Sequence, residues 1–309
     1  MSGGGNGGLN GGLNGGLNGG LNGGLNGGLS SGAAGSAGYV VLPYGTPVKS
    51  NTIKYVVPGL PLAYPKADWA SELRAQVILA EFGARGWSQP TKASVKGKAW
   101  HGDGLSIEAP DFSTPDSLQK ELKVLNDHMN GLRPESLAEL IAQIDNAGAY
   151  WANLLAMNPA AKPQSFVLLS VGYTVGQMVG MYFKDFFGMA RPVHYIPSLV
   201  TSVPTPPHPS FPSNHALQNY LVLQLLTAAL PAGAKNHLYP YMKALADRLA
   251  TNREIAGVHF PSDTKAGESI ANWLFSKHLS QMASIVEIID AAKLEWADRT
   301  GTQEVDILA

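Results

Sequence analysis

The 309-residue sequence predicts an all-α protein, a helical bundle that follows an extended N-terminal arm. From residue 67 onward, apolar residues recur at helical spacing between glycine and proline punctuation. Hydrophobic residues make up 45% of the chain, which is enough to bury one large core or two modest ones. We therefore divide the chain into residues 1–38, 39–66 and 67–309, and expect the bundle in the last region.

The N-terminal region is a four-residue repeat of the form GGLN over residues 3–29. Its glycine content is typical of a flexible tail. Positions four apart also share one face of an extended strand, so the leucines and the asparagines would line opposite sides and could stack between chains. A homo-oligomer formed through the repeat is therefore possible. Residues 30–38 resemble a linker, and the proline-rich residues 39–66 predict an extended arm lying on the core.

The bundle is expected to contain long helices. Thr114 before Pro115 predicts an N-cap with proline at the first helical position, and Ser136 with Glu139 has the spacing of a capping box. The expected helices are Asp68–Phe82, Pro115–Met129, Pro134–Met157, Pro163–Phe187, His215–Leu230, Leu238–Ile255 and Asp263–Asp298.

Charge and targeting signals limit the function classes. The net charge is −1 and no long basic stripe is present, so we expect no nucleic-acid partner. Without a visible signal peptide we expect a cytoplasmic protein. The uncharged run 166–183 could be a membrane helix. Because the other helices carry charges and no second clear span follows, we expect a buried central helix and no membrane span.

Two cations follow the uncharged run 166–183. Lys184 and Arg191 are seven residues apart, nearly two helical turns, and Pro192 ends the helix. They share one face. They are either solvated charges at a helix C-terminus, where the dipole favours cations, or part of an anion-binding site.

The stretch PSNH at 212–215 places polar residues at the start of an apolar helix. Ser213 is a natural N-cap, and the free backbone N–H groups of such a terminus bind anions. His215 would stand in the first turn, able to exchange a proton near neutral pH. An ordinary histidine in a capping region is the alternative.

A third cluster lies in TNREIAGVHFPSD. Gly257 and Pro261 allow the chain to turn so that His259 faces the same way as Arg253. Asp263 can then reach the His259 ring, fix its tautomer and make the other ring nitrogen a better nucleophile or ligand. A capping aspartate beside a structural histidine is the alternative.

Together these segments resemble the type 2 phosphatidic acid phosphatase superfamily, which includes soluble bacterial acid phosphatases, membrane lipid phosphatases and vanadium haloperoxidases. The resemblance covers roughly residues 160–280, through K-x6-RP at 184–192, PSNH at 212–215 and NR-x5-H-x3-D at 252–263. The family usually has glycine at the position of Asn214 and serine at that of Asn252. The Asn214 side chain could narrow the pocket or add a donor.

The resemblance implies a role for each matched residue. His259 would attack phosphorus and form a phosphohistidine, His215 would protonate the leaving alkoxide and later activate water, and Asp263 would orient His259. No metal would be needed. The phosphate oxygens would be held by Lys184, Arg191, Ser213, Asn214 and Arg253.

The leading expectation is a metal-independent phosphatase of the acid phosphatase type, acting on a small phosphate monoester without a cofactor. A vanadium-dependent haloperoxidase is the alternative, with vanadate in the same pocket and His259 as its axial ligand. His208 and His194 could then shape the surroundings of the cofactor, or be ordinary loop histidines. A second alternative is an assembly-forming protein with a vestigial site.

Overall fold

The computed structural model describes residue 66 and residues 69–297, and over this range the prediction of an all-α fold is confirmed. The GGLN repeat and the extended arm, except for Lys66, lie outside the described residues. The helices are α3 (Ser71–Gly83), α4 (Pro115–Gly131), α5 (Arg133–Leu154), α6 (Pro163–Phe187), α7 (Pro192–Tyr195), α8 (Asn214–Ala229), α9 (Ala232–Ile255), α10 (Pro261–Trp273) and α11 (Ala283–Trp296). The strands are β1 (Ala99–Gly102) and β2 (Leu105–Glu108).

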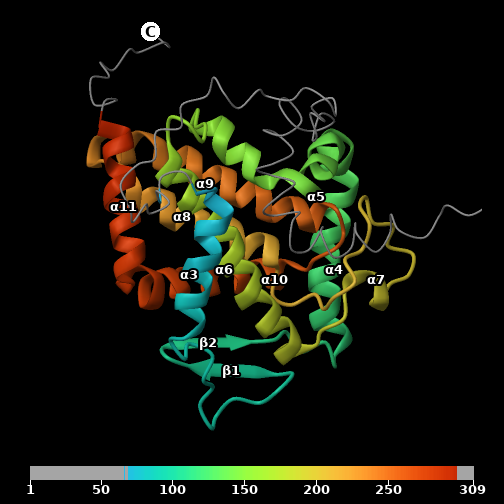
Figure 1. The fold of residues 1–309 in the computed structure, drawn as a ribbon. Coiled ribbons are helices and arrows are strands. Elements are labelled where there is room, and N and C mark those ends of the chain that lie inside the picture. Colours follow the sequence, from blue (N-terminus) through green and yellow to red (C-terminus); the bar gives the residue numbers. More distant parts are fainter. Residues whose placement is uncertain (1–65, 67–68, 298–309) are drawn as a thin grey trace, which may run out of the picture.

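Helices α6 and α8 form the centre of the bundle (Figure 1). Helices α3 and α11 pack against α6, while α9 and α10 pack against α8. The main hydrophobic core runs between these helices. Two smaller apolar clusters, one around Val258 and one around Phe260, flank the chain between α9 and α10. This arrangement brings the ends of α6, α8, α9 and α10 together, and those ends carry the motifs found in the sequence.

Three glycines on one face of α6 set the distance between α6 and α8. A Cβ atom on Gly172 would lie 2.5 Å from Val222 Cγ2 and 3.3 Å from the Val222 backbone. One on Gly176 would lie 2.9 Å from Gln218 Cγ, and one on Gly180 would overlap the Asn214 amide. The four-residue spacing repeats along one helical face, so α8 approaches the α6 backbone over two turns.

The expected helix Pro163–Phe187 has the same bounds in the structure, and α4, α5 and α8 lie within three residues of their expected ends. Helix α9 begins six residues earlier than predicted and contains Pro240 in its interior. The single helix expected over Asp263–Asp298 is wrong. The chain leaves α10 through a π turn (Leu274–His278) and a 3-10 turn (Leu279–Gln281), after which α11 packs back on α6.

The capping box expected at Ser136 and Glu139 is also wrong. Helix α5 already begins at Arg133, so Ser136 lies inside it. Glu139 instead accepts hydrogen bonds from Arg248 of α9, with Nε 2.7 Å from Oε2. At α4 the N-cap position of Thr114 is confirmed, although its side chain makes no capping hydrogen bond. Pro115 at the first helical position is sufficient to start the helix.

A β-hairpin that the sequence analysis missed joins α3 to α4. Trp100 pairs with Ile107 across the two strands, and both side chains are buried. The turn residues Asp103 and Gly104 have φ of 44° and 80°. An Asp-Gly pair between two short alternating segments is a strong hairpin signal, and positive φ at both positions fits a type I′ turn. The signal was therefore present in the sequence.

The close contact between α6 and α8 predicts the effect of a single methyl group. Gly172→Ala should lower the free energy of unfolding by about 1–3 kcal/mol, because the new Cβ meets Val222 and overpacks the core. Gly233→Ala in α9 is the matched control, since nothing lies within 4 Å of its added Cβ. There the better helix propensity of alanine should leave stability equal or higher. Urea unfolding of both variants measures the difference, and equal stabilities would contradict this account of the contact.

Candidate active site

The start of α8 forms the floor of the site. Ser213 is the N-cap, and its Oγ accepts a hydrogen bond from Ala216 N at 3.3 Å, as predicted. Its own backbone N–H donates to the Asp263 carbonyl oxygen at 3.0 Å. This bond ties the first turn of α8, which carries His215, to the first turn of α10, which carries Asp263.

His259 and Asp263 form a buried pair, as their spacing suggested. Gly257 adopts φ of 79° after the end of α9, which turns the chain and brings His259 back toward the helix ends. His259 Nδ1 lies 2.8 Å from Asp263 Oδ2, and both side chains are buried. Because an ionised carboxylate only accepts, Nδ1 carries the proton and Nε2 presents a lone pair. The arrangement can support a nucleophile at Nε2.

Burial and charge shift the pKa values of this pair. Burial raises the pKa of Asp263 to about 6, against the opposing effects of a Ser210 hydrogen bond and the Lys184 charge. Burial holds the pKa of His259 well below its usual range, with further lowering by the Arg191, Lys184 and Arg253 cations. His259 is therefore neutral near pH 7, the form in which Nε2 can attack or bind.

Lys184 and Arg191 are buried beside this pair, but main-chain carbonyls occupy their donors. Lys184 Nζ lies 2.7, 2.6 and 2.6 Å from the carbonyl oxygens of Pro209, Ser210 and Pro212. Arg191 donates from Nε to the His208 carbonyl at 2.9 Å and from Nη1 to the Val258 carbonyl at 2.6 Å. Arg191 Nη1 also lies 3.4 Å from His259 Nε2. Carbonyl dipoles thus solvate both buried charges.

Arg253 and His215 differ from these two cations. Within the described part of the chain, the buried atoms Arg253 Nη1 and His215 Nε2 have no hydrogen-bond partner. The two groups are close enough for the Arg253 charge to act on His215. Burial, followed by that charge, lowers the pKa of His215 to about 3. A buried guanidinium nitrogen and an imidazole nitrogen that lack partners are suited to receive an anion.

The Asn214 side chain points away from these groups. Its Nδ2 donates to Gln177 Oε1 at 3.0 Å on α6, and its amide fits against Gly180. Asn214 therefore leaves the cation cluster unobstructed and joins the start of α8 to α6. Its backbone N–H remains in the first turn of α8, where no intrahelical acceptor exists.

The sequence analysis missed two polar residues that support the site. Ser210 donates from Oγ to Asp263 Oδ2, the same oxygen that faces His259. Asn219 donates to the His215 carbonyl at 2.8 Å and accepts from Trp151 and Tyr173. Asn219 lies one helical turn after His215, a spacing that could have suggested it. Ser210 reaches Asp263 only through the folding of its loop, so no local pattern marks it.

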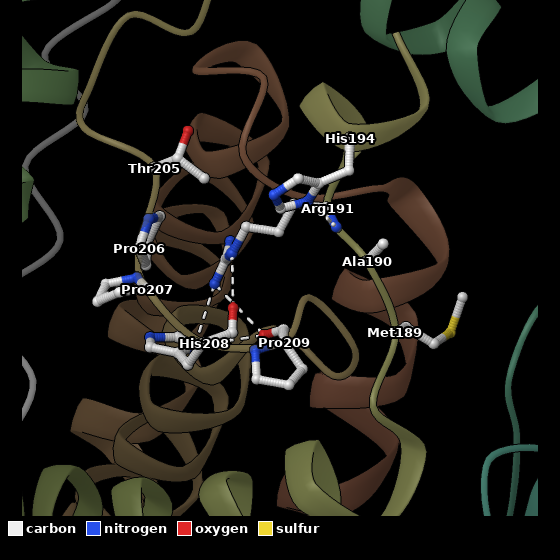
Figure 2. Close-up of a pocket in the computed structure, with 9 residues that line it drawn as sticks. All are labelled: Met189, Ala190, Arg191, His194, Thr205, Pro206, Pro207, His208 and Pro209. Atoms are coloured by element: carbon white, nitrogen blue, oxygen red, sulfur yellow. Dashed lines mark hydrogen bonds between the residues drawn. The ribbon is translucent and has the colours of Figure 1, made fainter. Parts of the chain in front are cut away.

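A pocket of about 380 Å³ opens beside Arg191 (Figure 2). Its walls include His194 of α7 and His208 of the following loop, the two histidines whose role the sequence left open. Arg191 Nη2 lies 3.1 Å from His208 Nδ1, and the Arg191 backbone N–H donates to His194 Nδ1 at 3.1 Å. Both histidines therefore contact a predicted anion-binding residue.

Curated relatives are phosphatases. The chain is 28% identical over 135 residues to a decaprenylphosphoryl-5-phosphoribose phosphatase of Mycolicibacterium smegmatis, covering 42% of this chain and 69% of that protein. It is 29% identical over 123 residues to the protein of the same name from Mycobacterium tuberculosis strain H37Rv, covering 39% of this chain and 64% of that protein. The phosphatase class expected from the sequence is thus supported.

Two solved structures are similar to this chain. One is a transmembrane PAP2 type phosphatidylglycerolphosphate phosphatase from Bacillus subtilis, with a TM-score of 0.43, 13% identity, and coverage of 66% of this chain and 92% of that chain. The other is a bacterial vanadium-dependent iodoperoxidase, with a TM-score of 0.42, 15% identity, and coverage of 64% of each chain.

These findings contradict the expectation of a small phosphate ester and no membrane span. The curated relatives are named for a lipid-linked substrate. In the described residues, the segment Pro163–Tyr195 is long and apolar enough to cross a membrane, although most of it is buried inside the protein. The expectation rested on the absence of a second apolar span, and membrane association does not require two. The expectation of a small substrate and no membrane span is therefore withdrawn.

The hydrogen bond from Ser210 allows a test of the His259–Asp263 pair. Ser210→Ala removes a hydrogen bond that favours the Asp263 carboxylate, so the pKa of Asp263 should rise above its value of about 6. Since the ionised carboxylate holds Nδ1–H of His259, the acidic limb of a kcat/KM profile should move to higher pH. Ser210→Thr keeps the hydroxyl and is the matched control. If the acidic limbs of Ser210→Ala and the parent protein coincide, Ser210 does not tune Asp263.

The predicted site residues fall within the range that one protein family matches. The PAP2 superfamily matches residues 165–284, a range that contains most of α6, all of α8 and α10, and each motif described above. The structure brings those motifs to one buried cluster. Residues 165–284 of this chain match the PAP2 superfamily, the family that the motifs resemble.

Proposed function

We propose that this protein is a phosphatase that hydrolyses phosphate monoesters of lipid-linked molecules through a phosphohistidine, without a metal ion or other cofactor. The observation that carries the proposal is the buried His259–Asp263 pair, in which Nδ1 is held by the carboxylate and Nε2 lies 3.4 Å from Arg191 Nη1. The PAP2 match and the curated phosphatases support the reaction class, and their names support the lipid-linked substrate.

In the first step, the Nε2 lone pair of His259 attacks phosphorus. The new N–P bond forms as the P–O bond to the leaving group breaks, and His215 gives its proton to the departing alkoxide. Asp263 stabilises the positive charge that develops on the His259 ring, because its carboxylate accepts Nδ1–H at 2.8 Å. In the second step, His215 takes a proton from water, the hydroxide oxygen attacks phosphorus, and the N–P bond breaks.

His215 must be protonated for the first step, although its pKa is about 3 in the ligand-free site. Burial and the Arg253 charge cause this low value, and a phosphate dianion reverses the second cause. Bound between Arg253 and His215, the dianion neutralises the cation and favours the imidazolium. Substrate binding therefore raises the pKa of His215 toward the value that a general acid requires.

The cations take the part that magnesium plays in other phosphoryl-transfer enzymes. Arg253 Nη1 has no partner in the described residues and can donate to a phosphate oxygen directly. Lys184 and Arg191 add positive charge to the site, while their donors bind main-chain carbonyls. The backbone N–H groups at the start of α8 complete the cradle for the charge that develops in the transition state.

The central experiment measures phosphate release from farnesyl phosphate and phosphatidate in detergent micelles, in the presence of EDTA. The parent protein should release phosphate, and His259→Ala should abolish release, because no neighbouring group replaces the nucleophile. After an alkaline quench, labelled phosphate should remain on the parent protein and should be lost in acid. His237→Ala, an exposed histidine of α9, is the control. Release by His259→Ala at the parent rate would overturn the proposal.

Orthovanadate tests the cradle and the competing reaction. Vanadate resembles the transferring phosphoryl group in shape, so it should inhibit phosphate release. Arg253→Lys should bind vanadate about tenfold more weakly, because a guanidinium can hold two oxygens and an ammonium acts as a point charge. Inhibition of both proteins at the same vanadate concentration would show that Arg253 does not hold the bound anion. Bromide oxidation by peroxide that appears only with added vanadate would replace the phosphatase with a haloperoxidase.

A further inference from the structure

The guanidinium of Arg191 borders both the nucleophile and the pocket of Figure 2. Its Nη1 lies 3.4 Å from His259 Nε2, whereas its Nη2 lies 3.1 Å from His208 Nδ1 in the pocket wall. A phosphate held at His259 is therefore next to the pocket. The part of the substrate that carries the phosphate can occupy it.

The two histidines of the pocket offer hydrogen-bond donors. His194 Nδ1 accepts the Arg191 backbone N–H. His208 Nδ1 lies 3.1 Å from Arg191 Nη2 and 3.3 Å from the Pro209 carbonyl oxygen. We assign Nδ1 as the acceptor, because a guanidinium can only donate and Arg191 Nη2 is the nearer partner. A neutral imidazole that accepts at Nδ1 carries its proton on Nε2. Burial, with the Lys184 and Arg191 charges, lowers the pKa of His208 to about 4, so this ring is neutral near pH 7. The pocket thus presents Nε2–H groups to acceptor oxygens.

The remaining walls are of mixed character. Pro206 and Pro207 contribute apolar surface, and Thr205 contributes a hydroxyl-bearing side chain. Its volume of about 380 Å³ is at the small end of the ligand-pocket range of roughly 300–1,000 Å³. A single ring with its substituents fits such a space, and a long isoprenoid chain does not. Among the lining residues Arg191 is the one permanent cation, so a second phosphate lacks a partner.

We propose that this pocket binds the sugar of a phosphorylated sugar headgroup, with sugar hydroxyl oxygens accepting from Nε2–H of His194 and His208. The apolar face of the sugar ring would lie against Pro206 and Pro207. The inference rests on the proposed phosphatase function and narrows its substrate class. The lipid part of the substrate stays outside the pocket.

The test compares two soluble probes of the headgroup, ribose 5-phosphate and n-butyl phosphate, which both release a primary alcohol. For the parent protein, kcat/KM should be at least about tenfold higher for ribose 5-phosphate, since one or more hydrogen bonds distinguish the probes. In His208→Asn and His194→Asn, the amide oxygen replaces Nδ1 as acceptor and the Nε2–H is lost. Each variant should raise KM for ribose 5-phosphate several-fold and leave that for n-butyl phosphate nearly unchanged. His237→Asn is the matched control.

The outcomes separate this inference from the function on which it rests. Equal kcat/KM for the two probes in the parent protein would contradict the proposed sugar site and leave the phosphatase function intact. Equal losses of kcat/KM on both probes in the asparagine variants would also contradict the sugar site and leave the phosphatase function intact. They would show that the histidines only position Arg191. If the parent protein hydrolyses neither probe nor the lipid phosphates, the phosphatase function fails together with the sugar site. Melting temperatures of the variants show whether a loss reflects unfolding.

Discussion

The ammonium group of Lys184 organises the site, because it binds three main-chain carbonyls of the segment 209–212 at once. A buried ammonium has three donors and must find an acceptor for each. By using all three on one loop, Lys184 fixes the chain that leads into the N-cap Ser213. The same loop supplies the Ser210 hydroxyl to Asp263 and the His208 carbonyl to Arg191. The positions of the carboxylate and the cation therefore depend on one buried charge.

The close packing of α6 against α8 buries the Lys184 ammonium group. Lys184 lies one turn after Gly180, the last of the three small residues that allow α8 to approach the α6 backbone. A larger residue at Gly180 would displace Asn214 and move the start of α8. The distance between Lys184 and the helix terminus is thus set by main-chain contact between two core helices. Core packing is rigid on this scale, so the site is preorganised by the same contacts that stabilise the bundle.

The sequence was sufficient for the parts of the site that depend on helix chemistry. Ser213 as N-cap, the turn at Gly257 and the pairing of His259 with Asp263 follow from spacing and local conformational preference. The hydrogen bond from Ser210, the pocket beside Arg191 and the direction of Asn214 arise from tertiary contacts between segments distant in sequence. The π turn after α10 was missed for a similar reason. Apolar periodicity continues through it, and only the packing of α11 on α6 reveals the break.

The hydrogen bonds of the cations divide them into two classes. The donors of Lys184 and Arg191 already bind carbonyl oxygens, while the buried atoms Arg253 Nη1 and His215 Nε2 lack partners in the described residues. An anion can bind Arg253 Nη1 and His215 Nε2 without displacing any protein group. It would interact with Lys184 and Arg191 through charge, or by exchanging a carbonyl dipole for a full negative charge, which is the stronger partner. The carbonyls thus stabilise the buried cations in the ligand-free protein and leave the anion-binding groups in place.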